Sequence, residues 1–123
     1  MALVDTNILL RWLLADHPEL TAKAETIINT AKPGTLVVTD IVAAEVVYVL
    51  RGRGYDRLQV SEAMQLITRT PQLIYENPAI ILHTVDHFAT TGLDFADCYL
   101  LSRHELEQIE LHTLDNKLYK MSR

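Results

Sequence analysis

The stretch TLVVTDIVAAEVVYVL, residues 35–50, joins a strand pattern directly to a helix pattern. Its first five residues are rich in β-branched side chains, which favour a pleated, extended strand. Thr39 or Asp40 can then cap a helix from Ile41 to about Arg51, and Gly52 follows as a stop signal. A short apolar strand that leads at once into a helix is typical of an α/β fold.

The same alternation continues along the rest of the chain, where Pro18 and Pro78 each open a helix pattern. It predicts a mostly parallel central sheet of four strands, or of five, flanked by helices on both faces. The chain length of 123 residues suits a single domain over residues 1–123. The predicted strands are 2–5, 35–39, 73–75 and 109–114, and the predicted helices are 8–15, 18–30, 41–51, 57–70, 78–92, 95–107 and 117–121.

Composition restricts the class of protein. The only cysteine is Cys98, so the chain can form no internal disulfide bond. Asp5 and Arg11 interrupt the N-terminal apolar run, so we expect no signal peptide, no membrane partner and a cytoplasmic location. The net charge of -5 argues against a general nucleic-acid binder, unless some acids gather to hold cations.

Two aspartates follow predicted strands. Asp5 ends the first strand, and Asp115 ends the last one in the stretch ELHTLDNKL. Ligands of an open parallel α/β sheet bind beyond the carboxyl ends of the strands. If the two strands are neighbours, both carboxylates lie at the same edge of the sheet. Each aspartate can instead be only a helix cap or a turn former.

Glu45 is flanked by apolar residues on both sides, so we expect its helix to be buried almost all round. An ionised carboxylate in such a place is costly unless something compensates its charge. A cation at the sheet edge is one such compensation, since the side chain leans back towards the N-terminus of the helix. A protonated side chain, or an ion pair with Arg11 or Arg51, is another.

The stretch GLDFADCYLL offers two further acids. Asp94 suits the cap of a late helix, and Asp97 takes the capping-box position three residues later. Asp97 can instead face the crevice as a metal ligand. Asp5, Glu45, Asp97 and Asp115 would then form an all-oxygen cluster, which suits Mg²⁺ or Mn²⁺ better than zinc.

The pattern of cysteines and histidines in the sequence does not support a zinc site. Only His83 and His87 have a metal-ligand spacing, four residues apart on one helix. Their helix pattern is otherwise amphipathic, and we expect the pair to lie on the surface.

Taken together, four features resemble the PIN-domain nucleases: Asp-Thr-Asn after the first strand, the lone Glu45, Asp97 in a late helix, and TLDN after the last strand. The length resembles that of the VapC-type toxins of toxin–antitoxin pairs. The resemblance implies that the four acids bind Mg²⁺ or Mn²⁺, that Thr6 and Thr113 supply site hydroxyls, and that Asn7 caps the first helix. It also implies endoribonuclease activity, a homodimer and a cognate antitoxin protein. Asp94 competes with Asp97 for the place of the helix acid.

A cluster of this kind predicts a reaction. Bound cations lower the pKa of a water molecule and neutralise charge on the phosphate, so that water can attack in line. The expected products carry a 5′-phosphate and a 3′-hydroxyl, because no ribose 2′-hydroxyl takes part. Candidate contacts to the substrate are the cations Arg11, Arg51, Arg53, Arg57, Arg103 and Lys117, each of which can equally be an ordinary solvated charge.

Other classes remain open from the sequence. A PIN nuclease of RNA processing would carry the same acids. An Asp-x-Asp-x-Thr phosphatase also starts from a strand-end acid, but Asn7 stands where its second acid would be. A receiver domain gives Glu45 no role, and a PIN-like domain that only binds a partner would not need all four acids.

Overall fold

The computed structural model describes residues 1–123. Its three strands form one parallel sheet in the order β1 (Ala2–Leu3), β2 (Leu36–Val38) and β3 (Leu73–Tyr75). In this register Leu3 lies beside Val37, which lies beside Ile74. The α/β class and the parallel pairing predicted from the sequence are therefore confirmed.

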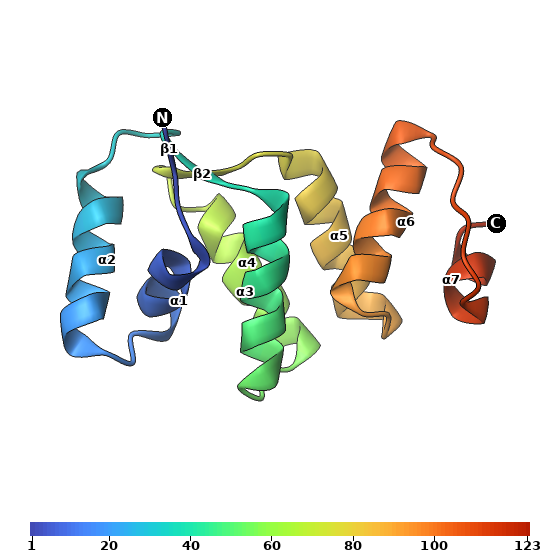
Figure 1. Cartoon of the computed structure of the whole chain (residues 1–123), viewed down its shortest axis with the longest axis horizontal. Coiled ribbons are helices and arrows are strands. Elements are labelled where there is room, and N and C mark those ends of the chain that lie inside the picture. Colours follow the sequence, from blue (N-terminus) through green and yellow to red (C-terminus); the bar gives the residue numbers. More distant parts are fainter.

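Seven helices accompany the sheet, and none of them is long and apolar enough to cross a membrane. Helices α1 and α2 lie at one end of the long axis, and α6 and α7 lie at the other end (Figure 1). The helices are α1 (Thr6–Leu14), α2 (Pro18–Thr30), α3 (Asp40–Gly52), α4 (Arg57–Thr68), α5 (Pro78–Thr91), α6 (Phe95–Glu107) and α7 (Asn116–Met121).

The first helix begins at Thr6, and the prediction that Asn7 caps it at Ile8 is wrong. Asp5 is the cap, because its Oδ1 accepts a hydrogen bond from the backbone N–H of Ile8 at 3.0 Å. Asn7 lies inside the first turn with its side chain exposed. Asp5 is in the extended conformation that a cap requires, whereas Asn7 is already helical.

One face of the sheet has buried side chains, whereas side chains on the other face are partly exposed to solvent. Leu36, Val38, Leu73 and Tyr75 are buried in the core. Leu3 and Ile74, which flank Val37 on the opposite face, are 74% and 41% exposed. The expectation that helices cover both faces is thus only partly met.

The predicted fourth strand, residues 109–114, is wrong in this structure. The segment forms no backbone ladder, and β1 pairs with β2 alone. The segment instead contacts α6 through His104, whose ring nitrogens lie 2.6 Å from the carbonyl oxygen of Ile109 and 3.0 Å from that of Ser122. The side chain of Leu111 is buried, and it lines a small pocket together with Tyr99 and His104 of α6.

Candidate active site

Asp5, Thr6 and Glu45 form the first group of predicted site residues. Asp5 caps α1 with Oδ1, and the next residue, Thr6, is buried. The hydroxyl of Thr6 donates a short hydrogen bond to Oε1 of Glu45 on α3. The N-terminus of α1 and the middle of α3 therefore meet at this hydroxyl.

Glu45 itself lies in an exposed position, which corrects the expectation of a buried carboxylate. Ile41 and Tyr48 on the same face of α3 are 81% and 82% exposed, so the apolar run contains a solvent-facing stripe. Neither Arg11 nor Arg51 pairs with Glu45. Since its carboxylate is accessible to solvent, no buried charge has to be compensated.

The second group lies at the N-termini of α6 and α7. Asp94 caps α6 by accepting from the N–H of Asp97 at 3.2 Å, as predicted. Asp115 caps α7 by accepting from the N–H of Leu118 at 2.8 Å, and its own N–H donates to Oγ1 of Thr113 at 3.0 Å. Each cap occupies one carboxylate oxygen, Oδ1, which leaves Oδ2 free of hydrogen bonds.

Asp97 lies between these two caps and is half-buried. Burial raises the pKa of its carboxyl group, and the nearby carboxylates of Asp94 and Asp115 raise the pKa further. No lysine or arginine contributes to this shift in the opposite direction. Asp94 and Asp115 thus lie near enough to Asp97 to disfavour its charged form, although the three carboxylates do not form a group with their oxygens within 4.8 Å of one another.

The structure does not bring the two groups into one tight cage. Helices α1 and α7 lie at opposite ends of the molecule, with α3 between them (Figure 1). No three of the four predicted acids bring their oxygens together: the one group of three or more potential ligand atoms within 4.8 Å of one another is formed by other residues. The route by which Asp115 was expected to reach Asp5, a strand beside β1, is absent.

A groove nevertheless connects α3 with the start of α6. Its volume is about 550 Å³, and Glu45 and Asp94 both line it. The side chains of Arg51 and Arg57 line the same groove, together with the exposed Tyr48. It therefore places one acid from each group beside two cations and an aromatic ring, a combination suited to a phosphate backbone and a base.

The six cations predicted to touch substrate all have partners within the chain. Arg11 and Arg53 pair with Asp16 at 3.1 and 2.9 Å, and this pairing lowers the pKa of Asp16. Three of the other four donate to backbone carbonyl oxygens: Arg51 to that of Tyr55, Arg57 to those of Phe88, Gly92 and Leu93, and Lys117 to that of Thr91. Arg103 donates to the carboxylate of Glu107.

Two side-chain groups were missed by sequence reasoning. Oδ2 of Asp40 accepts hydrogen bonds from the hydroxyl of Tyr99 at 2.6 Å and from Asn77 at 3.0 Å, which ties α3 to α6. His83 and His87 meet Glu105 on α6. The spacing of the two histidines was a visible signal, but their partner on another helix was not.

Comparison with known proteins gives one family. The family model described as PIN domain matches residues 2–123. Proteins with this domain are generally nucleases that depend on divalent metal ions. No curated protein and no solved structure matches the chain significantly. Since the match covers nearly the whole sequence, the chain belongs to the PIN-domain family.

Proposed function

We propose that the protein is an endoribonuclease that depends on Mg²⁺ or Mn²⁺, with Asp97 at the centre of its site. The observation that carries this proposal is the position of Asp97 near Asp94 and Asp115, where burial and these two carboxylates raise the pKa of the Asp97 carboxyl group. A nuclease site needs such acids, since a hard cation binds oxygen ligands. The groove lined by Glu45 and Asp94 would let an RNA strand reach the site.

The donor set fits a divalent cation of this kind. Asp97 would hold it together with the free Oδ2 atoms of Asp94 or Asp115, and all of these ligands are oxygens. When bound, the cation would supply a water molecule of lowered pKa and would neutralise charge on the phosphate. The Thr113 hydroxyl accepts from the backbone N–H of Asp115, and the Thr6 hydroxyl donates to the carboxylate of Glu45 and would orient it.

The place of Asp5 and Glu45 in the site is part of the same proposal. Both are exposed, and Asp5 uses only Oδ1 for its cap. We propose that they contribute their carboxylates when substrate and metal bring the two groups together. Closure of the groove on the strand would reduce the distance between α3 and the start of α6.

We also propose that the enzyme is the toxin of a toxin–antitoxin pair, in the cytoplasm, silenced by a cognate antitoxin protein and active as a homodimer. The exposed Ile41, Tyr48 and Leu58 support a protein partner, since large apolar side chains on a surface favour association. Ile41 and Tyr48 share the face of α3 that carries Glu45. A partner bound there would cover the groove and block access to it.

Purified protein, freed of any partner, should cleave a structured RNA in the presence of Mn²⁺ or Mg²⁺ and should be inactive in EDTA. The measurement is gel electrophoresis of an end-labelled RNA, followed by analysis of the new ends. Because water is the proposed nucleophile, the products should carry 5′-phosphates and 3′-hydroxyls. Cleavage that persists in EDTA, or that leaves 2′,3′-cyclic phosphates, would contradict the proposal.

Induced expression of the chain in a bacterial host should arrest growth, and co-expression of the short reading frame next to its gene should restore growth. The matched control is the Asp97→Asn variant, which should be made at the same level without arresting growth. Harmless expression of an active nuclease would favour the second candidate, a PIN nuclease of RNA processing, for which the same acids would serve.

A further inference from the structure

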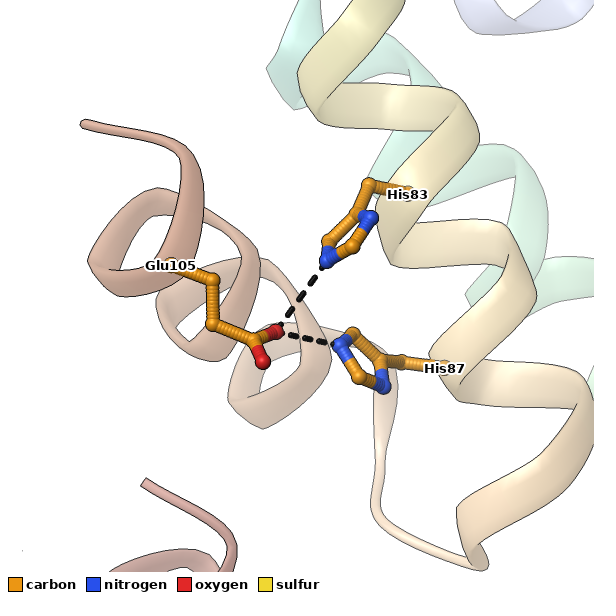
Figure 2. A group of neighbouring side chains, drawn as sticks. All are labelled: His83, His87 and Glu105. Carbon is orange, nitrogen blue, oxygen red and sulfur yellow. Dashed lines mark hydrogen bonds and ion pairs between the residues drawn. The ribbon is translucent and has the colours of Figure 1, made fainter. Parts of the chain in front are cut away.

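Two histidines and one glutamate converge on the side of the molecule formed by α5 and α6. Nε2 of His83 lies 3.1 Å from Oε1 of Glu105, and Nε2 of His87 lies 2.5 Å from the same oxygen. The two imidazole rings stand edge to face, with centroids 4.7 Å apart. Figure 2 shows both rings, on successive turns of α5, pointing towards the carboxylate on α6.

Local structure explains this convergence. Residues four apart on a helix lie on one face, so His83 and His87 project from α5 in the same direction. Gly92, in the left-handed conformation, ends α5 and lets the chain turn back into α6. The last turn of α6 then returns alongside α5 and places Glu105 opposite the two rings.

The ligand atoms have the chemistry and the spacing of a metal centre. One atom from each of the three side chains lies within 4.8 Å of the other two. Tetrahedral zinc with bonds of about 2.0 Å keeps its ligand atoms roughly 3.3 Å apart. The 3.1 Å contact of His83 with Glu105 is near this value, whereas the 2.5 Å contact of His87 is a hydrogen bond that a rotation of the side chains has to lengthen before an ion enters.

We propose that His83, His87 and Glu105 bind a divalent transition-metal ion, zinc in particular, and that this ion clamps α5 to α6. Imidazole nitrogens favour zinc over magnesium, which separates this site from the all-oxygen group at Asp97. The side chains of His83, His87 and Glu105 are 36%, 20% and 40% exposed, so an ion can enter and a water molecule can complete its shell.

The zinc site does not depend on the proposed nuclease activity. Asp94 and Asp97 lie at the N-terminal end of α6, whereas Glu105 lies in its last turn. A clamp between the helices stabilises the pair that presents Asp97, whether or not Asp97 binds a metal of its own. Binding of zinc and cleavage of RNA can therefore be measured and can fail separately.

Titration of the untagged, metal-free full chain with zinc chloride tests the proposal. Calorimetry should show saturation at about one equivalent of zinc, and the Tm should rise by several degrees because zinc binds the folded chain only. Cobalt(II) in place of zinc should give the intense visible absorption of a tetrahedral site. Glu105→Gln removes a direct ligand of the ion. It should therefore weaken zinc binding by more than the roughly tenfold loss caused by removing a residue that only hydrogen-bonds to a metal ligand.

Variants assign the site to its residues. His83→Ala and His87→Ala should each lose the cobalt absorption, and the double variant should lose the rise in Tm. His112→Ala is the matched control, because His112 is an exposed histidine that faces only Glu110, at 3.6 Å. Unaltered zinc binding by the double variant, or no binding by the unchanged chain, would overturn the proposal.

Discussion

Replacement of Asp97 by asparagine should abolish metal-dependent RNA cleavage and, in the metal-free protein, raise the free energy of unfolding at neutral pH. The first effect follows from the loss of the central ligand of the proposed site. The second follows from electrostatics, because burial and the nearby carboxylates of Asp94 and Asp115 disfavour the ionised Asp97 carboxylate in the folded state. A residue that costs stability while it is needed for activity is typical of a functional site.

The difference in stability between the variant and the unchanged protein should depend on pH in a definite direction. Burial and the two acidic neighbours raise the pKa of Asp97 in the folded protein above its value in the unfolded chain. Protonation of Asp97 therefore favours folding, and this contribution is lost as the pH rises through the raised pKa. The variant should exceed the unchanged protein in stability above that pKa, and the difference should vanish below about pH 3.9. Urea unfolding in EDTA across this range is the measurement.

Substitutions of Asp94 are the matched controls for those of Asp97. Asp94→Asn should keep the cap of α6, since asparagine caps a helix as well as aspartate does. Asp94→Ala should lose about 1 kcal/mol of stability with the cap. If Asp94→Asn were inactive and Asp97→Asn were active, the two roles assigned from the sequence would have to be exchanged.

Local signals explain what the sequence predicted well. Pro18 and Pro78 open α2 and α5, and Thr39 and Asp94 cap α3 and α6, as expected. Each of these signals acts within a single turn of helix, so it does not depend on the rest of the fold. The coarse α/β class follows from such signals repeated along the chain.

Long-range contacts explain what the sequence could not predict. The segment 109–114 has the alternation of a strand, but it pairs with no strand of the sheet. The carbonyl oxygen of Ile109 lies beside a ring nitrogen of His104 on α6. Glu45 has apolar neighbours, but Ile41 and Tyr48 share its exposed face. A periodic pattern does not show which apolar residues remain in solvent. The proposed acids consequently lie in two groups connected by a groove.

Arg57 shows the same limit, because the sequence left it open as a substrate contact or a solvated charge, and in the structure it binds backbone carbonyls. Its Nη1 donates to the carbonyl oxygens of Phe88 at 2.9 Å and Leu93 at 2.6 Å, and Nη2 donates to that of Gly92 at 3.0 Å. Its guanidinium carbon lies 4.3 Å from the centroid of the Phe88 ring. One side chain thus satisfies the carbonyls at the end of α5 and in the turn that precedes Asp94.

Arg57→Ala should therefore lower the free energy of unfolding by about 2–3 kcal/mol, since each hydrogen bond of a charged donor contributes about 1.5–3 kcal/mol and part of the loss is recovered by water. Arg57→Lys should recover only a fraction, because an ammonium group cannot reproduce the planar fork. Arg69→Ala is the control: Arg69 is exposed and its side chain makes no hydrogen bond, so the change should stay within about 0.5 kcal/mol. Urea unfolding measures all three variants. Should Arg57→Ala leave stability unchanged and only raise the KM for RNA, Arg57 would be a substrate contact after all, and the groove beside Glu45 would be where it acts.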